Sequence, residues 1–573
     1  MSLGIIGPRN ERRPSDVGPI VAGSGAALHR TDRRIHAAAT MRGMTTGRPA
    51  DAGHADPVTG RAAWTDGTAD MDPESFRTAA HEVVDLMADY LRDVESYAVF
   101  PSIEPGSIRP QLPSSPPDEP EPIEAILEDY RRIVEPNATH WQHPGFFAYF
   151  ATTASGPGIL GEMLTATLGQ NPMLWRTSPI GTELEETVVD WLRQALGLPE
   201  QFDGFFTDTA SMSSLIALGG AREAAGFDIA AGGLGGRPDV PRLRVYASAE
   251  AHSSIERALM TLGLGRESLS KIAVNGRYEM DVAALDRAIA ADRAAGVRPI
   301  AIVATIGTTS STSVDPVAAV ADVAEREGLW LHVDSAYAGP VALVPERRAP
   351  FAGWERADSV LINPHKWLFT PLDASLLLTR RMPDLRTAFS LVPEYLRTLD
   401  RETPVRDFSE YGPQLGRRMR ALKVWLIVRA FGLDGLRRRI DRHCELATAF
   451  AAWVDAEPDW ERLAPVPFST VCFRHVPSSM ADGGGGAEER LDAHNAAVMD
   501  AVNRTGEVFL SHTRLDGRFA IRLAVGNIRT EERHVVRAWE LLREAARHEG
   551  ASGTGGAAPA ATTALDATDA TGG

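Results

Sequence analysis

The chain of 573 residues lacks the features that mark membrane, secreted and nucleic-acid-binding proteins. It has no apolar run of about 18 residues, the length that a transmembrane helix needs. Its first residues do not show the basic and then apolar pattern of a secretory signal. The formal net charge of −17 argues against a nucleic-acid partner. We therefore expect neither a membrane nor a nucleic acid as partner.

Cysteine is also scarce. Cys444 and Cys472 are the only two, which allows at most one disulfide and no cysteine-based metal cluster. This usage fits the reducing cytoplasm, so we expect a cytoplasmic protein without a bound metal. Hydrophobic residues make up 44% and charged residues 24%, an ordinary globular composition. The length allows more than one domain.

The two ends of the chain differ in composition from its centre. Residues 1–70 show no apolar period and residues 549–573 contain little besides Ala, Gly and Thr, so both are predicted to be disordered. Residues 71–155 are predicted to be a helical N-terminal segment. Asp72 and Pro73 suit a helix start, and apolar residues follow at helical spacing to Val94. The proline-rich stretch 101–122 predicts an extended arm.

Residues 156–423 alternate helical patterns with short apolar strands, which predicts an α/β domain with a mostly parallel sheet. The pattern of residues 424–548 predicts a smaller α+β domain, which ends with a helix near Glu531–Ala546. The expected strands of the larger domain are Arg244–Ala247, Pro299–Thr305, Leu329–Val333, Ser359–Ile362 and Ala374–Thr379.

Polar side chains follow three of these strands. Asp334 comes directly after Leu329–Val333, Lys366 follows Ser359–Ile362, and His252 follows Arg244–Ala247. In open α/β sheets the ligand crevice lies outside the carboxyl ends of the strands, so these residues are expected to converge.

Pyridoxal phosphate needs such a set. A lysine amine bonds to its aldehyde, and a carboxylate keeps its pyridine nitrogen protonated so that the ring accepts electrons. The hydroxyl-rich stretch Thr207–Ser214 leads into a helical pattern and fits a phosphate cradle. Taken singly, each feature has an ordinary reading: a turn acid, a solvated lysine, a helix cap or a structural histidine. Their joint order favours the cofactor.

The chain resembles the group II pyridoxal-phosphate decarboxylases, and most closely the aromatic-L-amino-acid decarboxylases. The resemblance covers roughly Met71 to Ala546. It implies fold type I of the pyridoxal-phosphate-dependent transferases and a homodimer whose N-terminal arm wraps the partner. It is carried by the stretches His143–Phe150, Ala251–Arg257, Gly307–Thr309, His332–Gly339 and Asn363–Trp367.

The resemblance also implies the role of each cofactor-binding residue. Lys366 would bond to the cofactor, and Asp334 would pair with the pyridine nitrogen. His252 and Ala336 would pack on the two faces of the ring, and Thr309 would lie beside it. The residues implied around the phosphate are Thr209, Ala210, Ser211, Asn363 and His365. In this cradle Asp208 stands where relatives usually have glycine, and Met212 where an acid is common.

Further residues are implied on the substrate side. Tyr395 matches the tyrosine that protonates the substrate carbon after carbon dioxide leaves. Gly416 matches a position where plant relatives have glycine for indolic substrates, and it gives a slight preference for a tryptophan-like substrate. Asn171 and Met173 match positions that line the partner's pocket. Thr152, Trp141, Tyr149 and Phe150 are the remaining implied substrate contacts.

We expect an enzyme that decarboxylates an aromatic L-amino acid to its amine. Tryptophan-like substrates are slightly favoured over tyrosine, dopa and phenylalanine. The alternatives are an oxidative aldehyde synthase, a decarboxylase of a non-aromatic amino acid, an aminotransferase and a non-catalytic cofactor-binding protein.

Overall fold

The computed structural model describes residues 70–391, 405–481 and 486–552. Of the two ends predicted to be disordered, residues 1–69 and 553–573 fall outside the described residues, and so does Tyr395. The prediction was wrong for residues 549–552, which belong to the C-terminal helix α15 (Glu532–Ser552). Within the described ranges, no helix combines the length and the apolar character that a membrane span requires.

The N-terminal segment contains the predicted helix as α1 (Pro73–Asp93). Asp72 caps it, because its carboxylate accepts the amides of Glu74 at 3.0 Å and Ser75 at 3.1 Å. A second helix, α2 (Ile123–Asp129), follows the proline-rich stretch. None of the side chains of α1 is buried, and Phe76 is 57% exposed. In the single chain the apolar face of α1 therefore remains accessible.

The central sheet has seven strands in the order β1-β7-β6-β5-β4-β2-β3. Strands β2 to β6 pair in parallel, and β7 is antiparallel to both β1 and β6. The predicted mostly parallel sheet is confirmed. The strands are β1 (Asp203–Thr207), β2 (Leu243–Ser248), β3 (Leu269–Ile272), β4 (Arg298–Thr305), β5 (Trp330–Asp334), β6 (Ser359–Ile362) and β7 (Ser375–Thr379).

The strands β1 and β3 were not among those predicted from the sequence. β1 contains an aspartate and a glycine, both unfavourable in strands, and its pairing with β7 keeps it extended. β3 is a partly exposed edge strand of four residues. Neither segment has a pattern strong enough to be recognised without its neighbour in the sheet.

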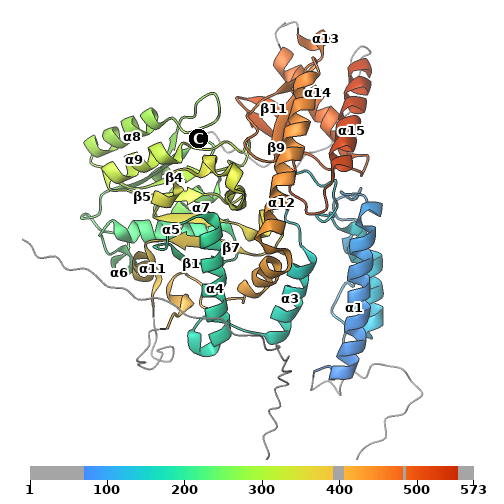
Figure 1. The fold of residues 1–573 in the computed structure, drawn as a ribbon, viewed down its shortest axis with the longest axis horizontal. Coiled ribbons are helices and arrows are strands. Elements are labelled where there is room, and N and C mark those ends of the chain that lie inside the picture. Colours follow the sequence, from blue (N-terminus) through green and yellow to red (C-terminus); the bar gives the residue numbers. More distant parts are fainter. Residues whose placement is uncertain (1–69, 392–404, 482–485, 553–573) are drawn as a thin grey trace, which may run out of the picture. The chain divides into compact units, whose positions relative to one another are not determined.

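Helices cover both faces of the sheet (Figure 1). Alternate strand residues point to opposite faces, so Ile302 of β4 packs in one core and Val303 in the other. The first face carries α4 (Pro179–Leu196), α8 (Val282–Ala294) and α9 (Val317–Glu327). The second carries α5 (Ala210–Ala224), α7 (Ser254–Thr261) and α11 (Met382–Phe389), beside the short α6 (Ile229–Gly232).

The C-terminal part is α+β, as predicted. Its antiparallel sheet has the order β10-β11-β9-β8 and packs against α14 and α15 around a core of its own. The long α12 (Ala421–Ala456) is interrupted at Gly432 and runs across the predicted boundary at 423/424, so that boundary stays a prediction. The other elements are β8 (Trp460–Arg462), β9 (Thr470–His475), α13 (Ser478–Ala481), α14 (Ala487–Asn503), β10 (Ser511–Leu515), β11 (Arg518–Ala524) and α15 (Glu532–Ser552).

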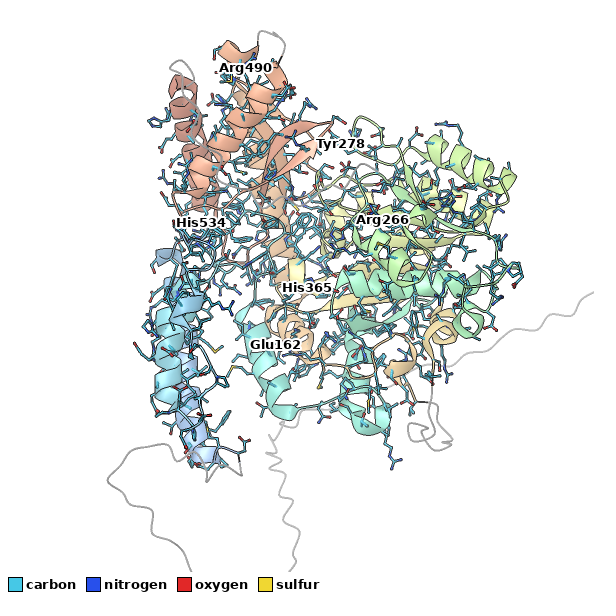
Figure 2. All side chains as sticks on the ribbon, turned by 180° about the vertical axis from the view of Figure 1, so that it is seen from behind. Glu162, Arg266, Tyr278, His365, Arg490 and His534 are labelled. Atoms are coloured by element: carbon cyan, nitrogen blue, oxygen red, sulfur yellow. The ribbon has the colours of Figure 1, made fainter. Side chains whose placement is uncertain are left out.

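Polar contacts connect these parts, and several of the residues involved are labelled in Figure 2. The hydroxyl of Tyr278 donates to Asp516 at 2.9 Å, which ties the loop after β3 to the β10–β11 turn. His534, just inside α15, lies 3.3 Å from Glu95, which follows α1. Cys444 and Cys472 are both buried free thiols.

Candidate active site

Asp334 and Lys366 leave the same edge of the sheet. Asp334 is the last residue of β5, and Lys366 lies in the short helix α10 (Pro364–Trp367) directly after β6. β5 and β6 are parallel neighbours. The segments that follow these two strands are linked by a hydrogen bond, which the amide of Asn363 donates to the carbonyl of Ala336 at 3.1 Å. The predicted pair is therefore brought together by the sheet.

Burial and charge set the protonation of Lys366. Burial, the larger effect, lowers the pKa of Lys366, and the charge of Asp334 raises it, with a net decrease. A lowered pKa favours the neutral amine, the form that attacks an aldehyde. Burial of Lys366 therefore shifts its side chain towards the neutral amine.

His252 completes this cluster from a third strand end. It follows β2, which is separated from β5 by β4, and its Nδ1 accepts the amide of Ser254 at 3.2 Å. His252 is exposed, yet desolvation by the protein around its ring lowers the pKa of His252. Lys366 lowers this pKa further and Asp334 raises it, so the three groups lie close enough to influence one another.

Several buried polar atoms at this edge have no partner within the described residues. They are Oδ1 of Asn363 after β6, Oγ1 of Thr305 at the end of β4, and Oγ of Ser254 at the start of α7. Buried polar atoms are normally hydrogen-bonded, so their position indicates a polar ligand at this edge. Together with a nucleophilic lysine and a carboxylate, they fit pyridoxal phosphate.

The predicted phosphate cradle lies at the start of α5. Thr209 is the N-cap residue, and Ala210 and Ser211 form the first turn. The hydroxyls of Thr207 and Ser213 are 2.8 Å apart and fix this turn to β1. The amides at a helix start favour an anion, as the cofactor phosphate would be.

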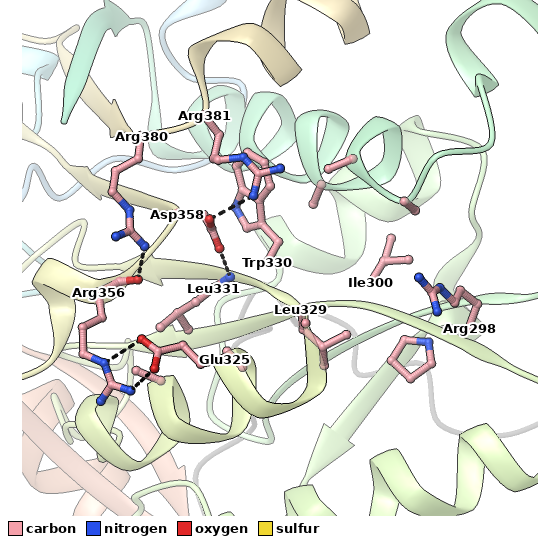
Figure 3. A pocket seen from close by; sticks show the side chains of 17 residues that line it. Arg298, Ile300, Glu325, Leu329, Trp330, Leu331, Arg356, Asp358, Arg380 and Arg381 are labelled. Atoms are coloured by element: carbon pink, nitrogen blue, oxygen red, sulfur yellow. Dashed lines mark hydrogen bonds and ion pairs between the residues drawn. The ribbon is translucent and has the colours of Figure 1, made fainter. Parts of the chain in front are cut away.

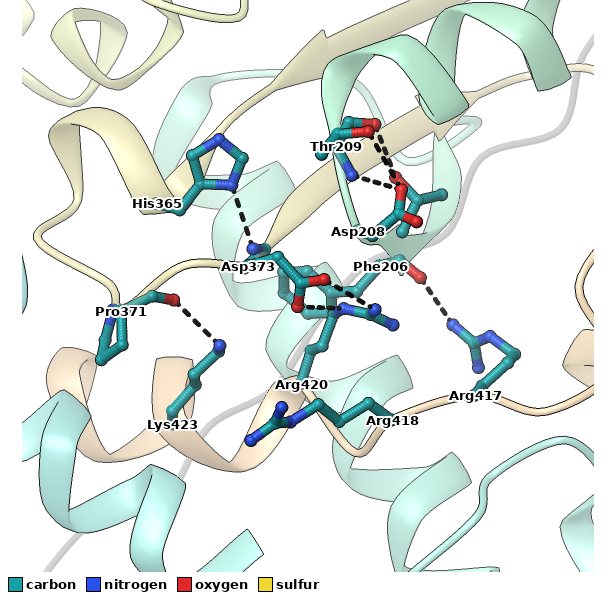
Figure 4. A network of polar contacts seen from close by, with 12 residues as sticks. Phe206, Asp208, Thr209, His365, Pro371, Asp373, Arg417, Arg418, Arg420 and Lys423 are labelled. Atoms are coloured by element: carbon teal, nitrogen blue, oxygen red, sulfur yellow. Dashed lines mark hydrogen bonds and ion pairs between the residues drawn. The ribbon is translucent and has the colours of Figure 1, made fainter. Parts of the chain in front are cut away.

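His365 approaches from α10, next to Lys366. Its Nδ1 accepts the amide of Ala374 at 3.0 Å, a contact drawn in Figure 4. Burial, followed by the charge of Lys366, lowers the pKa of His365 to about 3. The ring is therefore neutral. Its orientation is fixed by the hydrogen bond from Ala374, which directly precedes β7.

The predicted aromatic residues fall into two groups. Phe150 lies beside the lysine, with its ring centroid 5.3 Å from Nζ of Lys366, and it stacks on Tyr337 at 3.9 Å. Trp141 and Tyr149 instead stack on each other at 6.2 Å, and Trp141 also packs on Phe146 at 4.3 Å. Thr152 is half-buried two residues after Phe150.

Asn171, Met173 and Gly416 form a further cluster. Nδ2 of Asn171 lies 3.6 Å from Sδ of Met173, and its Oδ1 accepts the amide of Arg417 at 2.9 Å. A Cβ atom on Gly416 would lie 3.8 Å from Nδ2 of Asn171. The fold thus brings together three residues that lie up to 245 positions apart. Arg417 links the same two segments, because its side chain donates a hydrogen bond to the carbonyl of Pro172.

Arg522 was missed by the sequence analysis. This buried side chain of β11 donates to the carbonyls of Thr309 at 3.0 Å and Ser310 at 2.8 Å. Its guanidinium carbon lies 5.2 Å from the ring centroid of Phe150. Arg522 therefore holds the Thr309 loop from the C-terminal part. An arginine inside the otherwise apolar stretch Phe519–Ala524 was the signal available in the sequence.

A cavity of about 310 Å³ lies at the opposite ends of the central strands (Figure 3). Its walls include Arg356, which pairs with Glu325, and Arg381, which pairs with Asp358 at 3.2 Å and lies over the ring of Trp330. Arg298 also lines it. It is formed by the amino ends of β4 and β5, whereas the predicted site residues follow the carboxyl ends.

The chain is similar to known proteins over most of its length. Residues 105–476 match the model of the pyridoxal-dependent decarboxylase conserved domain. Phenylacetaldehyde synthase from Arabidopsis thaliana and tryptophan decarboxylase 2 from Oryza sativa subsp. japonica are each 38% identical, covering 83% of this chain and 96% and 95% of those proteins. The crystal structure of Oryza sativa tryptophan decarboxylase with pyridoxal phosphate and tryptamine has a TM-score of 0.79 at 36% identity, covering 83% of this chain and 99% of that one. The chain belongs to the pyridoxal-dependent decarboxylases and has their fold type I architecture.

Proposed function

We propose that this protein decarboxylates an aromatic L-amino acid to the corresponding amine and carbon dioxide, with pyridoxal phosphate as cofactor. Tryptophan-like substrates are slightly favoured over tyrosine, dopa and phenylalanine. The observation that carries the proposal is the cluster of Lys366, Asp334 and His252 beside the stacked ring of Phe150. The names of the relatives, which include tryptophan and tyrosine decarboxylases, support an aromatic substrate.

The cofactor, when bound, supplies a sink for the electron pair left at the α-carbon as carbon dioxide departs. Lys366 would hold its aldehyde carbon, and Asp334 would keep its ring nitrogen protonated. His252 would pack on the ring beside the substrate carboxylate. Arg522 would act indirectly, because its hydrogen bonds fix the carbonyls of the Thr309 loop. Tyr395, which lies outside the described residues, is proposed as the donor of the proton to the α-carbon.

The protein is further proposed to act as a cytoplasmic homodimer. Large apolar side chains are exposed on the N-terminal helices, among them Phe76, Ile126 and Val134. On α3 (Gly156–Leu168), Leu160 and Leu164 are at least half exposed. The proposal is that these exposed apolar side chains form part of the interface. The cluster of Asn171, Met173 and Gly416 is proposed to line the partner's substrate pocket.

The second candidate is an oxidative aldehyde synthase. It is favoured by one observation, the equal identity of the phenylacetaldehyde synthase and tryptophan decarboxylase relatives. Tyr395 and His252 favour simple decarboxylation by resemblance. Oxygen uptake with release of ammonia and peroxide would assign the aldehyde synthase reaction instead. Dependence on an α-keto acid would indicate an aminotransferase.

The cofactor attachment is tested with Lys366→Ala. Borohydride reduction of the purified wild-type protein should fix the cofactor covalently, and peptide mass spectrometry should locate it on Lys366. The variant should give no adduct on this peptide. A Lys271→Ala variant, which removes an exposed lysine of β3, should keep the adduct. An adduct that persists in Lys366→Ala would overturn the assignment.

The reaction is tested with a panel of tryptophan, tyrosine, phenylalanine, dopa and histidine, scored by carbon dioxide release and by the amine formed. Release from at least one aromatic substrate in a one-to-one ratio with its amine is expected. Release from histidine alone would contradict the aromatic assignment, and the absence of release from any amino acid would point to a non-catalytic protein.

A further inference from the structure

Asp208 lies beside the proposed phosphate cradle at the start of α5. It directly precedes Thr209, the N-cap residue of α5. Oδ1 of Asp208 accepts the Thr209 amide at 2.5 Å and the Thr209 hydroxyl at 3.1 Å (Figure 4). An amide and a hydroxyl at a helix start are the donors that an anion would use. The Asp208 carboxylate thus places an anion against these donors.

The carboxylate is also held from its other side. Oδ2 of Asp208 accepts Nε2 of Gln414 at 3.0 Å. Gln414 lies two residues before Gly416 and is half-buried. To turn away from the cradle, Asp208 would have to give up this hydrogen bond as well as those to Thr209. The side chain is therefore fixed at the cradle.

The charge of Asp208 is not compensated by these partners. The amide, the hydroxyl and the carboxamide that hold it are all neutral. A phosphate bound at the first turn of α5 would thus meet both an occupied pair of donors and a like charge on the residue that precedes Thr209. Two like charges about 4 Å apart repel each other even at the dielectric constant of water, which weakens binding by about fivefold.

We propose that Asp208 competes with the cofactor phosphate for the donors at the start of α5. This chain therefore binds pyridoxal phosphate more weakly than a variant with a neutral residue at position 208 would. The inference rests on the family's cofactor and on the proposed cradle at Thr209–Ser211. It gives a physical role to the one charged residue in the cradle stretch.

The decisive measurement is the dissociation constant of pyridoxal phosphate for the apo protein, followed by absorbance, compared with that of pyridoxal, which lacks the phosphate. Asp208→Asn removes the charge and keeps an oxygen acceptor. It should bind pyridoxal phosphate about five- to tenfold more tightly, with pyridoxal unchanged. Asp208→Gly also frees the Thr209 donors and should bind at least as tightly. Glu200→Gln, an exposed acid near the other end of β1, is the charge-matched control and should leave both constants unchanged.

A second readout is independent of the lysine chemistry. Inorganic phosphate should raise the melting temperature of apo Asp208→Asn more than that of the apo wild type. Unchanged or weaker pyridoxal phosphate binding in both Asp208 variants would overturn the proposal, and so would an equal gain for pyridoxal. A cofactor adduct that persists in Lys366→Ala would reject only the proposed attachment site. The phosphate-induced shift in melting temperature does not depend on Lys366.

Discussion

Single buried groups near the candidate site show how burial sets their charge. Asp315 accepts the amides of Met280 and Thr305, each at 2.8 Å, and so fixes the end of β4, where Thr305 lies. Burial raises the pKa of Asp315 to about 7, although the two hydrogen bonds oppose this shift. At Lys366 burial acts in the other direction and lowers the pKa. In both cases the neutral form is favoured.

The raised pKa of Asp315 predicts a pH dependence of stability. Its pKa in the folded protein is about 7, above the ordinary value of 3.8, so the folded state keeps a proton that the unfolded chain releases between these values. The free energy of unfolding should therefore fall as the pH rises through this window and level off above it. Urea unfolding at several pH values measures this slope.

Asp315→Asn is the matching variant. It cannot titrate, so its slope between about pH 4 and pH 7 should be shallower than that of the wild type. Its amide nitrogen cannot accept a backbone amide, so its overall stability should be lower by about 1–3 kcal/mol. Parallel slopes in the two proteins would show that Asp315 is not the titrating group.

A substitution of Tyr395 tests which product the reaction forms. Tyr395→Phe removes the hydroxyl that is proposed to protonate the α-carbon, so amine formation should fall by about 10²-fold or more. Aldehyde should become the main product. Chromatography of the products with the preferred aromatic substrate checks this, and Tyr411→Phe, in the described segment after residue 404, is a control that should keep amine formation. Intact amine formation in Tyr395→Phe would exclude Tyr395 as the donor.

At the scale of elements, the close contact of α3 and α12 depends on a glycine. A Cβ atom on Gly161 of α3 would lie 2.6 Å from Cα of Lys423 in α12. At this crossing Lys423 is buried, bonds to Glu162 and donates to the carbonyl of Pro371 at 2.9 Å (Figure 4). The two helices can approach this closely because Gly161 has no side chain.

Gly161→Ala should therefore force the helices apart and destabilise the fold by about 1–3 kcal/mol. Gly156→Ala is the control in the same helix, because a Cβ atom there would meet nothing within 4 Å. The control should leave the melting temperature unchanged or slightly higher, since alanine is the better helix former. Equal melting temperatures for both variants would contradict the packing argument.

At the scale of the whole molecule, the accessible apolar face of α1 supports the proposed dimer. Phe76→Glu places a charge on that face and should shift the protein from dimer towards monomer in analytical ultracentrifugation. His81→Glu introduces the same residue at another exposed position of α1 and is the control for charge. A Phe76→Glu variant that sediments as the wild type does would exclude this face from the interface.

The sequence alone was enough to predict the strands that carry the chemistry. Their apolar runs end in Asp334 and in the turn to Lys366, and this local pattern does not depend on the rest of the chain. The family, the cofactor and the overall α/β class followed from the same stretches. The predicted helix start at Asp72 was also confirmed, since capping involves only neighbouring residues.

Other features were decided only by the tertiary structure. β1 is extended because β7 pairs with it, and Arg522 reaches the Thr309 loop across more than 200 positions of sequence. The separation of Phe150 from Trp141 and Tyr149 likewise depends on which rings pack together. The contacts of Asp208 complete this group, because the sequence shows an acid in the cradle but not its partner Gln414. Such contacts join residues far apart in the chain, and a local sequence pattern contains no information about which distant atoms meet.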